Sequence, residues 1–99
     1  MAHYRVRVIP GRLAFEKTII DANGRARMIG SGQVATPDEA ANEAALAILA
    51  DHLRGDFPRA WRLVDSFERE FLSGDFTERT IDAGAVDRWV RQRERNSRG

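Results

Sequence analysis

The opening residues of the chain alternate between apolar and polar positions, a pattern with a period of two. Tyr4, Val6 and Val8 are apolar, whereas Arg5 and Arg7 between them are charged. This period is typical of a β-strand that buries one face and exposes the other. We therefore expect a strand at residues 3–9, with its arginines on the solvent side.

Two short motifs divide the rest of this region into strands. Pro10-Gly11 is a turn sequence, and Asn23-Gly24 between two β-like runs is the commonest signature of a tight type I′ hairpin. They predict a three-stranded antiparallel meander with strands at residues 3–9, 13–20 and 25–29. We interpret Gly30-Ser31-Gly32, which follows, as a chain reversal that ends the sheet.

From residue 36 onward the signals are those of α-helices. Thr36 as N-cap, Pro37 at the first helical position and Glu39 as the partner in a capping box mark a helix start. This helix should cover residues 37–53. Because its stretch at 44–50 is apolar nearly all round, we expect it to touch both the sheet and the neighbouring helices.

Two further helices are predicted at residues 58–72 and 83–95. Apolar residues at three- and four-residue spacing give the first of them a core-facing stripe, which is Trp61, Val64, Phe67 and Phe71. The second follows the predicted cap Asp82 and presents Val86, Trp89 and Val90 to the core. The fold class is therefore α+β, a three-stranded meander with three helices packed on one face. We expect one domain over residues 1–99, with disorder confined to the last few residues.

The net charge of +1 hides a segregated distribution. Residues 1–35 hold six basic and two acidic side chains, a net charge of +4. Residues 36–82 hold five basic and eleven acidic side chains, a net charge of −6, and residues 83–99 return to +3. Each segment could meet a partner of opposite sign. The alternative is that the basic and acidic segments pack side by side and neutralise each other.

Two basic surfaces are candidates for partner binding. The predicted third helix carries an arginine row, which is Arg88, Arg91, Arg95 and Arg98, and the first strand exposes His3, Arg5 and Arg7. A basic helix can lie along phosphates or along an acidic protein. No aromatic residue interleaves with the helical arginines in a way that would favour stacking on single-stranded nucleic acid. The alternative for both surfaces is a plain solvated face.

The sequence lacks the residue patterns of the common active sites. There is no cysteine, which excludes disulfides and thiolate chemistry and favours a cytoplasmic setting. The two histidines, His3 and His52, have no metal-ligand spacing between them, and Asp51 and His52 point about 100° apart on a helix. Ser31 has no Gly-x-Ser-x-Gly elbow around it. We therefore expect no catalytic residue, no metal and no cofactor.

The same reading excludes two kinds of ligand. Asp38 and Glu39 occupy the first turn of the helix after Gly30-Ser31-Gly32, and these carboxylates would repel a phosphate there. The longest apolar run, Ala44 to Ala50, is seven residues, too short to span a bilayer. We therefore expect neither a nucleotide site nor a membrane partner.

Several of these segments together resemble a known family. Gly30-Ser31-Gly32, the run Ala-Leu-Ala-Ile-Leu-Ala-Asp-His-Leu at 45–53, the helix with Phe67 and Phe71, and Ile81 followed by Val86-x-x-Trp89 are similar to a small family of uncharacterised bacterial, phage and plasmid domains. The similarity covers about residues 28–90. It implies a shared fold and an origin in mobile elements, where many small proteins block a host factor.

These observations together predict a non-enzymatic protein-binding module. The resemblance makes it a candidate phage or mobile-element inhibitor of a host defence complex, of the anti-CRISPR type, with a host protein as its partner. The alternative is a nucleic-acid-binding domain that uses the arginines of the third helix and Arg5 and Arg7 of the first strand. A third class, a small enzyme or ligand-binding domain, would require a pocket lined by convergent polar groups.

Overall fold

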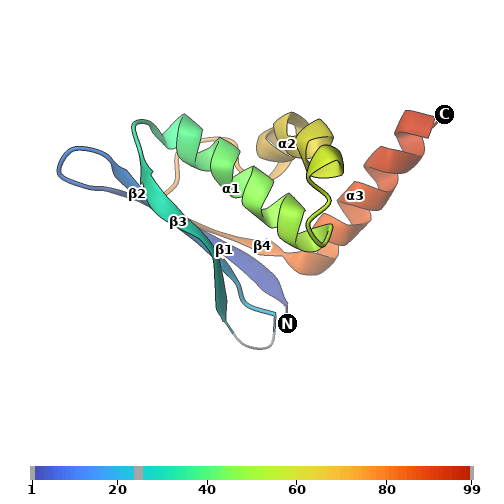
Figure 1. Ribbon diagram of the computed structural model, residues 1–99, viewed down its shortest axis with the longest axis horizontal. Helices are drawn as coiled ribbons and strands as arrows, with labels where there is room; N and C mark the ends of the chain where they lie inside the picture. The colour runs from blue at the N-terminus through green and yellow to red at the C-terminus, as the bar shows by residue number, and fades with distance from the viewer. Residues whose placement is uncertain (1, 24–25, 99) are drawn as a thin grey trace.

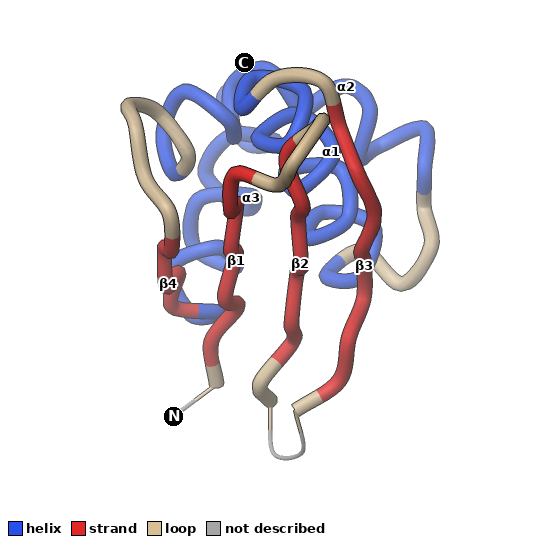
Figure 2. Tube along the Cα trace, turned by 90° about the vertical axis from the view of Figure 1, so that its left-hand side faces the viewer, coloured by secondary structure: helices blue, strands red, loops and turns tan. Residues whose placement is uncertain are grey.

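The protein is a four-stranded antiparallel sheet covered on one face by three helices (Figures 1 and 2). A computed structural model describes residues 2–23 and 26–98, and the side chains as far as Asn96. The elements in chain order are β1 (His3–Pro10), β2 (Phe15–Asp21), β3 (Arg27–Val34), α1 (Pro37–His52), α2 (Phe57–Phe71), β4 (Glu78–Asp82) and α3 (Ala83–Arg98). The strand order across the sheet is β3-β2-β1-β4. The α+β class and the one-sided packing of the helices are thus as predicted.

The predicted number of strands was wrong, because no strand was predicted at residues 78–82, where β4 lies. Its five residues pair antiparallel with β1, so that Ile81 lies opposite Tyr4 and Arg79 lies opposite Val6. Ile81 is buried, and the residues on either side of it are not. A strand this short shows too little alternation to be recognised, and its partner is more than seventy residues away in the sequence.

The interpretation of Gly30-Ser31-Gly32 as a chain reversal was also wrong, because all three residues lie within β3. That strand ends at Val34 and not at residue 29. A Cβ atom at Gly30 would lie 2.9 Å from Ile19 Cδ1 and 3.6 Å from the Cβ of Ala47, so the glycine lets α1 approach the sheet closely. Gly32 has a φ of 144°, which glycine adopts readily. These glycines serve close packing and backbone conformation, whereas the sequence signal suggested a turn.

The other boundaries differ from the predictions by a few residues. The strand predicted at 13–20 begins at Phe15, because the Gly11 N–H donates a 2.8 Å hydrogen bond to the Ala14 carbonyl and keeps the intervening residues in a turn. Gly24 of the predicted Asn23-Gly24 turn lies outside the described residues, as does the residue after it. Helices α1 and α2 match within one residue at each end, and α3 continues to Arg98 where the prediction stopped at 95.

The caps of the helices follow the predicted chemistry. The Glu39 N–H donates to Thr36 Oγ1 at 3.2 Å, and the Glu39 carboxylate accepts from the Ala35 N–H at 3.1 Å, one residue before the position in a standard capping box. Asp82 caps α3 by accepting a hydrogen bond of 2.9 Å from the Ala85 N–H. These bonds fix where α1 and α3 begin relative to the sheet.

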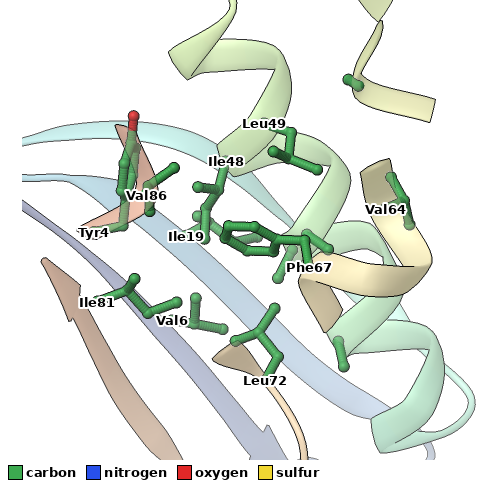
Figure 3. Close-up of a cluster of buried hydrophobic side chains, with 14 of the residues drawn as sticks. Tyr4, Val6, Ile19, Ile48, Leu49, Val64, Phe67, Leu72, Ile81 and Val86 are labelled. Atoms are coloured by element: carbon green, nitrogen blue, oxygen red, sulfur yellow. The ribbon is translucent and has the colours of Figure 1, made fainter. Parts of the chain in front are cut away.

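The core lies between the sheet and the helices (Figure 3). Its fully buried large side chains come from β1, β2 and all three helices, and they are Val6, Ile19, Ile48, Leu49, Val64, Phe67 and Val86. Phe67, Phe71 and Trp89 form an aromatic cluster between α2 and α3, with ring centroids 4.7 to 5.8 Å apart. None of the helices in the described part of the chain is long and apolar enough to cross a membrane.

The placement of Trp61 in the core was wrong, because this side chain is 59% exposed. The core-facing positions of α2 are Ala60, Leu63, Val64 and Phe67. Ala60, which is small enough for α1 to pack against the helix, takes the inward position. Its neighbour Trp61 is rotated by about 100° around the helix and points to solvent.

Candidate functional site

A groove of about 980 Å³ lies at the end of the molecule where α1 begins and α2 ends. The end of β1, the start of β2 and the segment 72–77 complete its walls. Its floor is apolar and consists of Val8, Phe15, Ala41, Leu72 and Phe76. Val8, Ala41 and Leu72 are buried, and the two phenylalanines are partly buried against the core. The floor is thus an open continuation of the hydrophobic core.

The segment 72–77 forms one wall of the groove and is fixed at two points. The Val8 N–H donates a 2.8 Å hydrogen bond to the Thr77 carbonyl. Arg79 donates through Nη1 to the carbonyls of Phe71 and Ser73, at 3.2 and 2.7 Å, and its guanidinium lies 4.3 Å from the centre of the Phe76 ring. Arg79 therefore satisfies carbonyls at the C-terminal end of α2 and positions Phe76 at the same time.

The rim of the groove is acidic. Asp38 from α1, Asp65 and Glu68 from α2, and Asp75 from the segment 72–77 line it, and Arg69 is the one basic residue among its described lining. Glu68 accepts a hydrogen bond of 3.3 Å from Asn42 Nδ2. Among the described residues, the other three carboxylates have no ion pair or side-chain hydrogen bond. The rim therefore carries a surplus of unpaired negative charge, which attracts cationic groups.

These carboxylates do not form a metal site. Within residues 2–23 and 26–98, no three histidine, aspartate or glutamate side chains lie close enough together to hold an ion. The described lining also contains no histidine, tyrosine or lysine. What the groove offers a ligand is an apolar surface bordered by fixed negative charges.

An exposed aromatic stripe on α2 extends the groove. Phe57 and Trp61 are 51% and 59% exposed, and they lie four residues apart on one face of the helix. Asp65, four residues further along, lies on the same face and lines the groove. This stripe was not predicted from the sequence, because Trp61 was assigned to the core. The absence of any apolar residue at the next position of that face, Asp65, was the signal that could have indicated it.

The turn between β1 and β2 stands beside the groove. Pro10 and Phe15, which pair across the ends of the two strands, both line the groove. Between them, Leu13 is 96% exposed and Arg12 is exposed next to it. Figure 1 shows this turn projecting beyond the start of α1, away from the body of the protein. We call residues 11–14 the hairpin tip.

The arginines predicted as binding residues lie on two separate surfaces. Arg5 and Arg7 belong to the open face of the sheet, which no helix covers (Figure 2). Arg88, Arg91 and Arg95 share the outer side of α3, where they line a shallow hollow of about 300 Å³ with Gln92 and Asn96. The side chain of Arg98 is not among those described.

Most of these arginines face carboxylates of the same chain. Arg5 Nε lies 3.8 Å from a Glu78 oxygen, and Arg88 Nη2 lies 3.9 Å from Asp82 Oδ2. Arg91 Nε makes a closer ion pair of 3.0 Å with Asp87, four residues before it on α3. Two of these pairs, Arg5 with Glu78 and Arg88 with Asp82, join a basic segment to the acidic segment 36–82, whereas Arg91 and Asp87 both belong to the basic segment 83–99.

Asp51 and His52 belong to different interactions, as expected from their positions on a helix. The Tyr4 hydroxyl donates a 3.1 Å hydrogen bond to Asp51 Oδ2, and Arg27 forms ion pairs with Asp51 and Asp21. Burial of the Tyr4 ring, together with the nearby charge of Asp51, raises the pKa of the Tyr4 hydroxyl well above its usual value. His52 Nε2 lies 3.3 Å from Asp87 Oδ1 on α3. This corner joins β1, β3, α1 and α3 and has a structural role.

Comparison with known proteins adds no relative to this picture: no protein-family model, curated protein or solved structure matches the chain. The resemblance to the family of phage and plasmid domains therefore stays a prediction from the motifs quoted above. The candidate function must be argued from the groove and its surroundings.

Proposed function

We propose that the protein binds another protein by holding one of its segments, basic and partly apolar, in the acid-rimmed groove. The observation that carries this proposal is the combination of an apolar groove floor with three carboxylates that have no partner among the described residues, Asp38, Asp65 and Asp75. An apolar floor alone would accept any hydrophobic segment. The unpaired rim selects a segment that also carries lysine or arginine.

The shape of the surface favours a chain segment over a compact small molecule. Asp65, which lines the groove, lies on the same face of α2 as Phe57 and Trp61, so the contact surface continues along α2. Trp61 can accept a cation on its exposed ring face. The described lining offers no histidine, tyrosine or lysine that could move a proton. An elongated surface whose titratable side chains are carboxylates on the rim, without histidine, tyrosine or lysine, suits recognition better than catalysis.

The expected energetics assign different roles to the floor and the rim. Burying one leucine- or phenylalanine-sized side chain on the floor contributes roughly 1.5 to 3 kcal/mol. A solvent-exposed ion pair at the rim contributes about 0 to 1 kcal/mol and mainly accelerates association. Affinity should therefore depend on the apolar contacts, and the choice between basic and acidic segments should depend on the carboxylates.

A peptide titration tests the proposal. The probe is a labelled twelve-residue peptide of alternating arginine and leucine blocks, compared with the same peptide carrying glutamate in place of arginine. We expect the basic peptide to bind and to shift amide NMR signals of the groove, around Phe15, Ala41 and Leu72. The acidic peptide should not bind. Failure of the basic peptide to bind, or shifts confined to another face, would overturn the proposal.

A matched pair of variants makes this experiment specific for the rim. The Asp65→Asn and Asp75→Asn double variant removes two unpaired carboxylates and should weaken binding of the basic peptide roughly 3- to 10-fold at low salt. Glu16→Gln with Glu70→Gln makes the same charge change away from the groove and should leave the affinity nearly unchanged. Equal effects of the two pairs would mean that only the net charge of the protein matters.

For the biological setting we propose a stoichiometric inhibitor of a host defence complex, the role that the resemblance to mobile-element domains implies. A protein that acts by occupying a partner needs a contact surface and no active site, which agrees with the groove. Expression in a bacterium with active CRISPR immunity should raise the plating efficiency of a targeted phage. The Asp65→Asn and Asp75→Asn variant should lower that effect, and no rise with the wild-type chain would contradict this role.

A second candidate function, nucleic-acid binding, is favoured by the arginine-lined hollow on α3. Arg95 is exposed without a carboxylate partner among the described residues, whereas Arg88 and Arg91 already face Asp82 and Asp87. Gel-shift assays with duplex DNA and single-stranded RNA test it. The Arg88→Gln and Arg95→Gln double variant should weaken binding several-fold, and Arg54→Gln with Arg62→Gln is the matched control. Absence of a shift at low salt would exclude this function.

A further inference from the structure

We propose that, in the absence of another partner, two copies of this chain fill each other's grooves, each inserting its hairpin tip into the groove of the other. This inference rests on the proposed function of the groove and concerns its regulation. It is carried by the composition of the tip, by its rigidity and by its position beside the groove.

The composition of the tip matches what the groove selects. Leu13 is 96% exposed, so nearly its whole side chain is available to another surface. A single exposed leucine is ordinary on a protein surface. Here, however, Arg12 stands next to it, so the tip pairs one apolar side chain with one cation. Leu13 can cover the apolar floor while Arg12 approaches the unpaired carboxylates of the rim.

The tip is held in shape before it binds. The Gly11 N–H donates a 2.8 Å hydrogen bond to the Ala14 carbonyl, and Pro10 pairs with Phe15 where the two strands end. A segment that is already ordered loses little conformational entropy on docking. The same pairing prevents the tip from folding back into its own groove, because Pro10 and Phe15 would have to separate.

The position of the tip allows a closed symmetric dimer. Pro10 and Phe15 flank the tip and also line the groove, so the two features lie side by side at one end of the molecule. A two-fold axis between them brings the tip of each copy to the groove of the other. Such an interface uses the same surface twice and closes at two copies, without free ends that would recruit further chains.

The other basic segment of the chain is a poorer occupant. The outer side of α3 carries Arg91, Arg95, Gln92 and Asn96 around its hollow, with no exposed apolar side chain among them. It could meet the acidic rim but would leave the floor of the groove in contact with water. The hairpin tip supplies both kinds of contact.

Dimer formation through the hairpin tips would compete with the binding of another protein. A dimer whose grooves are filled must dissociate before either groove can take a segment of another protein. Because two tips make a small interface, below about 1,200 Å² of total buried area, we expect a weak dimer. A partner that offers more apolar contacts than Leu13 would displace it, so binding and dimerisation compete.

Sedimentation experiments on the full chain test the dimer. Between about 10 μM and 1 mM the wild-type protein should change from monomer to dimer, as expected for a small interface. Leu13→Ser and Arg12→Glu should each keep the chain monomeric over that range. Met28→Ser and Arg54→Glu make matched changes at exposed positions away from the groove and should leave the dimer intact. Thermal unfolding shows whether each variant is folded.

The outcomes separate this inference from the proposed function. The dimer is supported if Leu13→Ser abolishes it and binds the arginine–leucine peptide more tightly than the wild-type chain at high protein concentration. A wild-type chain that stays monomeric at about 1 mM, or a dimer indifferent to Leu13→Ser and Arg12→Glu, would overturn the inference. In either case the peptide titration on monomeric Leu13→Ser still decides whether the groove binds a basic segment.

Discussion

The two ends of the molecule both carry many charged side chains, but the surroundings of those charges differ. At the end that contains α3, these charged groups are paired: Arg27 with Asp51, His52 with Asp87, and Arg59 with Glu94. At the groove end, Asp38, Asp65 and Asp75 have no such partner among the described residues and surround an apolar floor. The paired charges join elements of the fold, whereas the unpaired ones are available to a ligand.

This difference shows that a surplus of charge does not by itself identify a binding surface. The sequence drew attention to the arginine row of α3, where charge is most concentrated. In the structure, Arg88 faces Asp82 and Arg91 faces Asp87. The residues that line the hollow on α3 include no apolar side chain. Charged groups at the α3 end should therefore affect stability, and charged groups at the groove end should affect binding.

The largest effect is expected on the floor of the groove, where binding and stability cannot be separated. Leu72 is 2% exposed and belongs to both the core and the groove. Leu72→Ala should lower the free energy of unfolding by about 2 to 4 kcal/mol, because it leaves a cavity. Urea denaturation measures this, with Met28→Ala, at an exposed position, as a control that should change little. A small effect for Leu72→Ala would mean that segment 72–77 is not packed as described.

The next effect concerns pH at the α3 end, where Tyr4 donates to Asp51. Below its ordinary pKa of about 10, the tyrosine is protonated in both the folded and the unfolded chain. Above it, the unfolded chain releases the proton while the folded chain retains it, because burial raises the pKa of Tyr4. Stability should therefore fall as pH rises above about 10, by up to about 1.4 kcal/mol per pH unit.

A phenylalanine variant isolates this contribution. Tyr4 is the one tyrosine of the chain. Tyr4→Phe should be less stable near neutral pH by about 1 kcal/mol, because it lacks the hydrogen bond to Asp51. The difference between the variant and the wild-type chain should shrink as the pH is raised from about 9 to 11.5, measured by urea denaturation at each pH. A difference that stays constant would show that Tyr4 does not titrate in this way.

A smaller effect on stability is expected for the ion pair that joins α3 to α2. Arg59 donates through Nε to Glu94 at 2.9 Å, and both side chains are about one third exposed, so solvent screens the pair. Arg59→Gln should cost roughly 0.5 to 1 kcal/mol. It should also accelerate amide hydrogen exchange in the last turns of α3. Arg62→Gln, on the same helix but without an ion pair in the described structure, should change neither the stability nor the exchange rates. Equal exchange rates in both variants would show that the Arg59–Glu94 ion pair does not hold the end of α3.

The sequence predicted those parts of the fold that depend on interactions between residues close in the sequence, and it missed parts that depend on distant residues. Thr36, Pro37 and Asp82 are local helix-start signals, and each helix began where they indicated or within one residue. Glycine signals were ambiguous, since Gly30 leaves room for Ile19 of the adjacent strand and for Ala47 of α1, a packing arrangement that depends on a helix distant in the sequence. The β4 strand depended on pairing with β1, which no local pattern reveals.

The candidate site was harder to predict than the fold, because its residues come from five separate segments. Val8, Ala41 and Leu72 look like core residues in the sequence and are indeed buried; that they also line a groove depends on how these segments meet in the folded chain. The acidic excess of residues 36–82 was visible, but not which carboxylates would stay unpaired. Pairing depends on side-chain positions in the folded chain.

The smallest effect on stability is expected for Trp61, where a change should affect binding and leave the fold nearly unchanged. Trp61 is 59% exposed, so Trp61→Ala should change the free energy of unfolding by less than about 0.5 kcal/mol. The same change should weaken binding of the arginine–leucine peptide about fivefold, because a cation over an exposed indole contributes about 1 kcal/mol.

Trp89, which packs edge-on against Phe67 with ring centroids 5.5 Å apart, is the contrast. Trp89→Ala should destabilise the fold, since it empties part of the core. Unchanged peptide affinity in Trp61→Ala, with stability also unchanged, would remove the aromatic stripe from the binding surface and confine recognition to the groove.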